Sequence, residues 1–328
     1  MLNLILNHRR KFIALSVAAF AIVALFSTFN QTSAATKKTV IAIGRIVSHP
    51  SLNEIERGIV DALAERAYVD GETCQIVSAD AHGSIATATV IAHKFKSLDP
   101  DLVIPIATPM AQSFASIIKT PMVFAAVTDP LAARLVESLE KPGKNITGMM
   151  DMQPVAKQIA MVHQLMPELK TLGVVYNPGE INSVKVNEAI SKIAEETDLT
   201  VVFSPASKTC DVSTAASLLI GQVDAVFLTI DNTVISAVDS LLKITRPSKV
   251  PVFPSDSNTV FKQGAVAALA FDQYEMGKEI GQMAADVLES GEIGPVRQPE
   301  SLKYYLNTQE AGIMGIQAPD SVAFVTKN

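Results

Sequence analysis

The chain has 328 residues, of which 48% are hydrophobic, and its formal net charge at pH 7 is −6. This length suggests two domains of ordinary size. The acidic balance argues against nucleic acid or an anionic membrane as partner, but it leaves small zwitterionic molecules open as ligands.

Residues 1–35 have the pattern of a secretory signal peptide. Basic residues at positions 9–11 precede an apolar run from Phe12 to Phe29, and small residues at Thr32 and Ala34 mark a cleavage site. A permanent membrane anchor is the alternative, because the apolar run is at the short end of what spans a bilayer. No cysteine follows the run, so we expect no lipid anchor, and we predict a protein exported to the periplasm.

After Lys38 the chain alternates apolar runs of strand length with amphipathic stretches of helical spacing. Ser51 is expected to cap the first helix, with Glu54 completing a capping box. Pro109 is expected to open a later helix. In the first half, the predicted strands cover 39–46, 73–80, 101–108 and 121–129, and the predicted helices cover 51–68, 85–97 and a segment from Pro109.

The pattern restarts near Lys170. The second half is predicted to hold helices over 182–196 and 274–289 and strands over 170–178, 199–207, 223–232, 250–256 and 264–272. Similar short motifs recur in the same order in both halves, as in Asp101-Leu-Val-Ile and Asp224-Ala-Val-Phe. Strands that alternate with helices imply parallel sheets. We therefore predict an α/β fold of two doubly wound parallel-sheet lobes, with a ligand cleft at the carboxyl ends of their strands.

No motif for catalysis, metal binding or nucleotide binding is found: GxSxG, a P-loop, HExxH, CxxC and a GxGxxG after a strand are all missing from the sequence. We therefore expect no enzymatic activity, no metal and no cofactor. Polar residues gather instead where the predicted strands end. The candidates for ligand binding at these ends are His49, Thr108, Thr128, Asp129, Tyr176, Asn177, Asp231, Asn232 and Asp256.

Thr108 and Pro109 stand at the start of a predicted helix. The hydroxyl and the free N–H groups of such a helix start can bind a carboxylate without a cation. A plain helix cap is the equally good alternative. The run Thr128-Asp129-Pro130 repeats the arrangement.

Asp231 and Asp256 end strands of the second half, and either carboxylate could hold a ligand ammonium group by a charge-assisted hydrogen bond. Helix capping is the alternative for both. Tyr176 could cover an apolar face of a ligand or pack in the core. His49 could donate to a ligand or be a partly solvated loop residue.

Several of these segments also resemble a known family. The matches are His49-Pro50, 101–112, 121–136, 144–148, 172–183, 223–234, 250–256 and 264–277. They occur in family order across most of the chain after the signal peptide. The specific ones are YNPGEINS at 176–183 and the stretch from VTDP at 127–130 to ITG at 146–148, whereas the apolar strands alone are not specific. The chain resembles the substrate-binding proteins of ABC importers with the type I periplasmic fold, in the TrpX-like group linked to aromatic amino acids.

The resemblance implies two lobes joined by three crossing segments near 146–148, 271–273 and 303–307. Lobe one would comprise 36–147 plus 274–302, and lobe two 148–273 plus 303–328. The residues implied to face the ligand are Thr108, Thr128 and Asp129 from lobe one and Tyr176, Asn177, Asn182, Ser183 and Asp231 from lobe two.

The function that follows is the periplasmic binding component of an ABC importer. It would hold an amino acid, aromatic or large and apolar, and deliver it to a permease in the inner membrane. A sensory or regulatory ligand-binding module of the same fold is the alternative.

Overall fold

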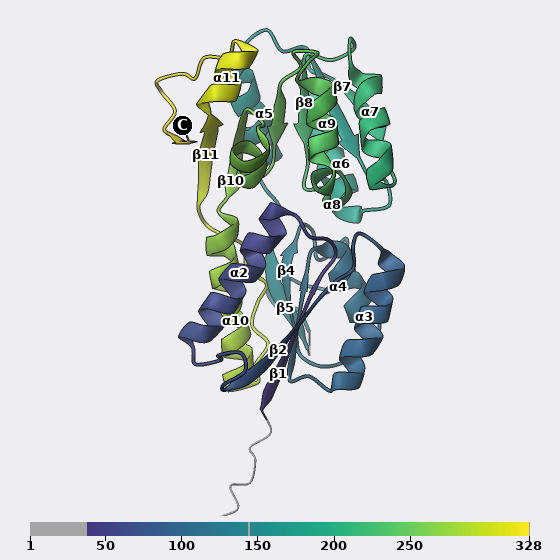
Figure 1. The fold of residues 1–328 in the computed structure, drawn as a ribbon, viewed down its shortest axis with the longest axis vertical. Coiled ribbons are helices and arrows are strands. Elements are labelled where there is room, and N and C mark those ends of the chain that lie inside the picture. The colour runs from purple at the N-terminus through teal and green to yellow at the C-terminus, as the bar shows by residue number, and fades with distance from the viewer. Residues whose placement is uncertain (1–37, 144, 328) are drawn as a thin grey trace, which may run out of the picture. The chain divides into compact units, whose positions relative to one another are not determined.

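The computed structural model describes residues 38–143 and 145–327, so the predicted signal peptide lies outside the described residues. No helix in these two ranges is both long enough and apolar enough to cross a membrane. Contacts join Thr39–Asn328 into one unit. Three sheets and the helices around them build this unit (Figure 1).

The first sheet has five parallel strands in the order β2-β1-β3-β4-β5. The two strands in its middle, β3 and β4, are buried along their whole length, as their continuous apolar runs predict. The strands are β1 (Thr39–Arg45), β2 (Cys74–Asp80), β3 (Leu102–Ile106), β4 (Met122–Val127) and β5 (Ile146–Met150).

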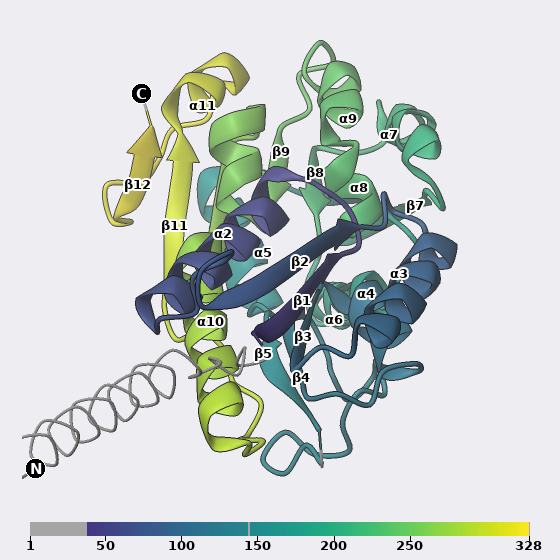
Figure 2. The ribbon, with the colours of Figure 1, turned by 60° about the horizontal axis from the view of Figure 1, so that its bottom comes forward.

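Helices cover both faces of the first sheet (Figure 1 and Figure 2). One face carries α3 (Ile85–Leu98) and α4 (Thr108–Ala115), and the other carries α2 (Pro50–Glu65) and α10 (Gln273–Ser290). We call the first sheet and these four helices lobe one.

The two helices α2 and α10 come from distant parts of the chain and pack at very close range. A Cβ atom added at Gly277 of α10 would lie 2.2 Å from the carbonyl oxygen of Ile55 in α2. Only glycine permits this approach, which holds α10 tightly against α2 within lobe one.

The second sheet has four parallel strands in the order β7-β6-β8-β9, which repeats the order of the first four strands of the first sheet. Its strands are β6 (Thr171–Tyr176), β7 (Thr200–Pro205), β8 (Ala225–Leu228) and β9 (Val252–Pro254). Helices α5 (Val155–Leu165) and α6 (Ile181–Glu195) cover one face, and α7 (Val212–Leu219), α8 (Asn232–Ser236) and α9 (Val238–Thr245) cover the other. The repeat that the sequence motifs indicate is thus visible in the topology.

A third sheet continues the second, because the amide of Val266 donates to the carbonyl oxygen of Val252 at 2.9 Å. In this sheet β10 pairs antiparallel with β11, and β11 pairs parallel with β12. The elements are β10 (Ala267–Phe271), β11 (Leu302–Asn307), α11 (Thr308–Met314) and β12 (Phe324–Lys327), with one π-helical turn, η2 (Thr259–Gln263), before β10. We call the second and third sheets and their helices lobe two.

The chain passes between the lobes at 151–154, at Asp272 and at 298–301. Two segments implied as crossings by the family resemblance, 146–148 and 303–307, lie inside strands β5 and β11. The strand β5 lies at the edge of its sheet, and β11 mixes exposed and buried residues, so neither gives the continuous apolar signal of a fully buried strand. The predicted class, an α/β fold with parallel sheets, is confirmed.

Candidate functional site

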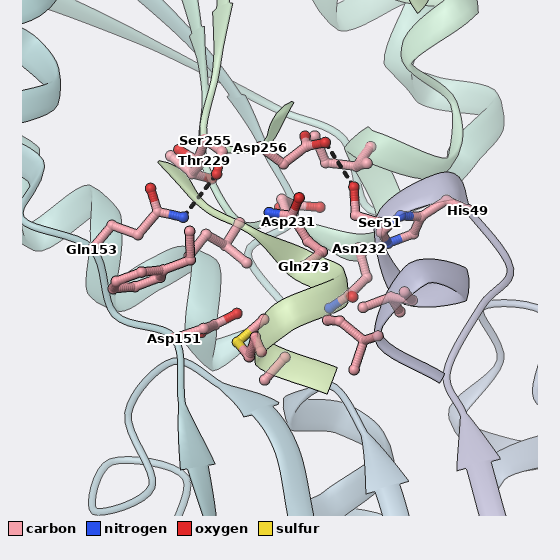
Figure 3. Close-up of a pocket in the computed structure, with 17 residues that line it drawn as sticks. His49, Ser51, Asp151, Gln153, Thr229, Asp231, Asn232, Ser255, Asp256 and Gln273 are labelled. Atoms are coloured by element: carbon pink, nitrogen blue, oxygen red, sulfur yellow. Dashed lines mark hydrogen bonds between the residues drawn. The ribbon is translucent and has the colours of Figure 1, made fainter. Parts of the chain in front are cut away.

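A pocket lies where the two lobes meet (Figure 3). Both lobes contribute to its wall, and the strands point their carboxyl ends at it, as expected for an open α/β sheet. Its lining residues are His49, Ser51, Leu52, Ile55, Ala126, Asp151, Gln153, Thr229, Ile230, Asp231, Asn232, Ile235, Ser255, Asp256, Phe271, Gln273 and Met276. They include no lysine and no arginine.

The start of α2 brings His49 and Ser51 into the pocket. Pro50 takes the first position of the helix, where its missing N–H is no loss, so His49 and not Ser51 is the N-cap. The predicted capping box is therefore wrong. The Ser51 hydroxyl instead donates to Oδ1 of Asp256 in lobe two at 2.6 Å, a buried hydrogen bond that joins the lobes.

His49 is 92% buried, with 8% of its surface exposed, and its Nδ1 has no hydrogen-bond partner among the described residues. Burial lowers the pKa of this imidazole to about 4. Arg45 lowers it further, while Asp256, Glu180 and Asp80 act in the opposite direction. The ring is therefore neutral at pH 7.

Asp151 directly follows β5 and is 6% exposed. The Thr128 hydroxyl donates to its Oδ1 at 2.9 Å, and no other hydrogen bond to this carboxylate is formed by a described side chain. Burial raises the pKa of the Asp151 carboxyl to about 6, although the bond from Thr128 lowers it. The pocket thus holds a buried carboxylate that no cationic side chain neutralises.

Glutamine side chains stiffen the wall beside Asp151. Gln153 donates from Nε2 to the carbonyl oxygen of Ser255 at 2.7 Å, which ties the first passage between the lobes to β9. Gln158 of α5 donates to Oε1 of Gln153 and to the carbonyl oxygen of Leu269 at 3.0 Å. Buried polar groups with all partners in place hold a fixed shape.

The Asp231 carboxylate serves the backbone. Its Oδ1 accepts from the amide of Val234 at 2.9 Å and caps α8, and its Oδ2 accepts from the amide of Asn177 at 2.6 Å. Burial, followed by the nearby Glu180 carboxylate, raises the pKa of Asp231 to about 7. This is the capping role that the sequence left open as the alternative.

Asp256 also caps a helical turn. It accepts from the amide of Thr259 at 2.8 Å and from the Thr259 hydroxyl at 2.6 Å, in addition to the bond from Ser51. Asp231 and Asp256 thus each accept more hydrogen bonds than Asp151 does.

The start of α8 is anchored by Glu180, a residue that the strand-end pattern did not single out. Its carboxylate accepts from the amide and side chain of Asn232, from the amide and hydroxyl of Thr233 and from the side chain of Asn182. The functional meaning of the YNPGEINS segment is thus local: it shapes the lobe-two wall of the pocket.

Of the twelve candidates from the sequence, four line this pocket: His49, Asp231, Asn232 and Asp256. The other eight do not: Thr108, Pro109, Thr128, Asp129, Tyr176, Asn177, Asn182 and Ser183. Pro109 and Asn177 line a neighbouring depression between the lobes. Tyr176 packs edge-to-face on Phe203, with 5.9 Å between ring centroids, beside a separate surface depression.

The remaining five support the wall from behind or serve their own turns. Thr108 accepts from the amide of Thr128 at 3.4 Å, and Thr128 in turn orients Asp151. Asp129 accepts from the amides of Leu131 and Ala132. Asn182 donates to the carbonyl oxygen of Ile230 at 2.7 Å, and the hydroxyls of Ser183 and Thr229 are 3.4 Å apart.

Sequence reasoning missed Asp151, Gln153, Phe271 and Gln273 as pocket residues. Asp151 follows β5, which was expected only as a crossing segment, so its place at a strand end gave no signal. Phe271 and Gln273 were assigned to a crossing segment and not to the site. Ser255 stands at a strand end and could have been found by that rule.

Comparisons with known proteins agree with this geometry. A family model described as ABC transporter substrate binding protein matches residues 40–328. The tyrosine-binding protein of Clostridioides difficile (strain R20291) is 32% identical over 304 residues, covering 91% of this chain and 88% of that protein.

Two solved structures extend the comparison. An ABC domain from Streptococcus pneumonia in complex with L-Trp has 34% identity and a TM-score of 0.84, covering 87% of this chain and 97% of that one. A ligand-free, open substrate binding protein with adhesive properties from Clostridium difficile has 31% identity and a TM-score of 0.66, covering 88% of this chain and 100% of that one. From the family match over residues 40–328 and the identity across most of its length, the chain belongs to the ABC transporter substrate binding proteins.

Proposed function

We propose that this protein is the periplasmic binding component of an ABC importer and that its ligand is an aromatic amino acid. The segment 1–35 exports it, an inner-membrane permease receives its ligand, and the protein itself catalyses no reaction. The tyrosine-binding relative and the L-Trp complex support this ligand class.

The observation that carries the proposal is the buried carboxylate of Asp151. A desolvated anion without a cationic partner is costly, and a ligand ammonium group would remove that cost. Asp231 and Asp256 are poorer candidates for the ammonium group, because backbone amides and, at Asp256, two hydroxyl groups already donate to their oxygens. We therefore assign the ammonium group of the ligand to Asp151.

The carboxylate of the ligand would be met by neutral groups, since no lysine or arginine lines the pocket. Thr229 and Gln153 lie on the same side of the pocket as Asp151 (Figure 3). This arrangement suits a zwitterion, whose two charges largely compensate each other, better than a free anion.

The ring of the ligand would occupy the apolar part of the pocket. Leu52 and Ile55 of α2 and Ile235 of α8 supply branched side chains from both lobes, and Phe271 and Met276 add an aromatic and a thioether surface. Ligand sites of this kind bury most of a small molecule against apolar walls with few polar groups.

We propose further that the lobes close on the ligand. At similar sequence identity, the chain superposes better on the L-Trp complex than on the open, ligand-free structure. The bond between Ser51 and Asp256 and the ion pair between Glu54 and Lys262, at 3.0 Å, both join α2 to lobe two and are compatible with a closed state. The moving bodies would be lobe one and lobe two, which the chain joins at 151–154, at Asp272 and at 298–301.

A thermal-shift panel of amino acids, dipeptides and sugars tests the ligand class. We expect tyrosine or tryptophan to raise the melting temperature, since a ligand at 100 times its Kd adds about 2.7 kcal/mol of stability. A response to a sugar with none to any amino acid would contradict the proposal. Isothermal calorimetry on the responding compounds would then give the affinity.

A further inference from the structure

The pocket has two polar ends of different character. Asp151 lies at one side of it, and His49 lies at the opposite side, next to Asn232 (Figure 3). The α2 residues Leu52 and Ile55 follow His49 within the first turns of the helix and line the pocket beside it. A ligand whose ammonium group meets Asp151 would therefore carry its side chain toward His49.

The imidazole of His49 has an unmet hydrogen-bonding atom. The residue is 92% buried, its side chain makes no capping bond to α2, and Nδ1 has no partner among the described residues. Buried polar atoms in native proteins almost always have a partner, so this exception calls for one. Because His49 lines the pocket, the ligand can supply it.

The surroundings of His49 favour a neutral partner. The ring is neutral at pH 7, as described above, and the carboxylates of Asp256, Glu180 and Asp80 and the guanidinium of Arg45 lie close enough to act on it. Three carboxylates against one cation disfavour an anion at this end, so the carboxylate of the ligand belongs elsewhere. The ammonium group of the ligand has a better partner in Asp151. The ligand group that meets His49 is therefore a neutral hydrogen-bonding group on the ligand side chain.

We propose that His49 selects aromatic amino acids that carry a hydroxyl group on the ring, so that tyrosine binds more tightly than phenylalanine. The inference rests on the proposed function, in which Asp151 holds the ammonium group. A phenol hydroxyl both donates and accepts, so it satisfies Nδ1 in either tautomer of the imidazole. Phenylalanine satisfies it in neither and would bury the nitrogen without a partner.

Calorimetric titration of the full exported chain with L-tyrosine and L-phenylalanine tests the proposal. The wild type should bind tyrosine at least about tenfold more tightly. His49→Phe keeps a planar ring of similar size without nitrogen atoms, and it should bring the two Kd values to within about twofold by weakening tyrosine alone. His93→Phe, a change at an exposed residue of α3, is the matched control and should leave the ratio unchanged.

Two amide variants keep the test decisive if His49→Phe does not fold. His49→Asn places an amide where Nδ1 lies and should keep the preference for tyrosine. His49→Gln places the amide near the Nε2 position and should lose the preference. The ratio of the two Kd values is the readout, because a purely structural role of His49 would weaken both ligands equally.

Failure of this inference is distinct from failure of the proposed function. Equal affinity of the wild type for tyrosine and phenylalanine, or an equal loss for both in His49→Phe, would overturn the role of His49 and leave the aromatic amino acid assignment standing. Binding of neither amino acid, nor of tryptophan, would overturn the proposed function and this inference with it.

Discussion

Replacing Asp151 by Asn should have opposite effects on stability and on ligand binding. The two side chains have nearly the same shape, and the Thr128 hydroxyl can still donate to the remaining oxygen. What changes is that the pocket no longer holds the negative charge of the ionised Asp151 carboxylate. We expect the ligand-free variant to be more stable than the wild type at pH 7 and to bind its ligand more weakly.

The gain in stability follows from the pKa of the Asp151 carboxyl, which burial raises from 3.8 to about 6. Below pH 3.8 the carboxyl is protonated in both the folded and the unfolded protein, so its burial adds no cost of ionisation to the free energy of folding. Between the two values the unfolded chain loses its proton first, so stability falls as the pH rises. Above about 6 the folded protein carries the full cost, which is about 3 kcal/mol at roughly 1.36 kcal/mol per pKa unit.

The loss in binding follows from the proposed contact with the ammonium group. A hydrogen bond to a charged group contributes about 1.5–3 kcal/mol, which corresponds to a roughly 10- to 150-fold increase in Kd for tyrosine. The neutral amide of Asn can still accept a hydrogen bond, so we expect a value toward the lower end of this range.

Urea unfolding of the ligand-free proteins and calorimetry with tyrosine measure the two effects. The stability difference between Asp151→Asn and wild type should be largest near pH 7 and should shrink as the pH falls toward 3.8, below which the carboxyl is protonated in both states. Asp198→Asn, at an exposed position, is the matched control and should change neither quantity. A variant that is less stable than the wild type at pH 7, or one with unchanged affinity, would refute the reasoning.

Three further outcomes are expected. In calorimetry, the affinity of the wild type for tyrosine should fall up to about tenfold per pH unit below about pH 6, because the protonated Asp151 must lose its proton to pair with the ammonium group. Asp151→Asn should lack this dependence, and a flat profile in the wild type would argue against the pairing. Ser51→Ala removes the bond to Asp256 and should speed ligand release in stopped-flow measurements by about tenfold or more, whereas an unchanged rate would mean that this bond does not hold the lobes together. Gly277→Ala should lower the free energy of unfolding in urea by about 1–3 kcal/mol, because its Cβ would collide with α2, whereas Gly294→Ala, in open space, should have little effect; equal effects would refute the close packing.

Local patterns in the sequence predicted the core of the fold. Continuous apolar runs at 101–108 and 121–129 became the buried strands β3 and β4, and helical spacing before Glu289 became α10. The sequence analysis did not predict β5 and β11 as strands: β5 contains a glycine and lies at the edge of its sheet, and β11 contains a lysine and mixes exposed and buried residues. Apolar periodicity is strong only where both faces of a strand are buried.

The strand-end rule predicted part of the site. It found His49, Asp231, Asn232 and Asp256, because the carboxyl ends of parallel strands meet at one edge of the sheet independently of loop conformation. It could not tell which oxygens of Asp231 remain for a ligand, since the amides of Asn177 and Val234 reach it only after the chain has folded.

The amino-acid sequence was enough to predict the class of fold, the repeat of one strand–helix pattern and the edge at which polar residues collect, because these depend on local periodicity and on strand direction. The lack, among the described residues, of a cationic partner for the buried Asp151 carboxylate and of any partner for Nδ1 of His49 became visible only in the folded protein. Those properties of Asp151 and His49 depend on side chains far away in the chain, such as Thr128 and Asp256, and on the exclusion of water between two lobes. Burial and pairing are set by the whole packed structure, and no local pattern encodes them.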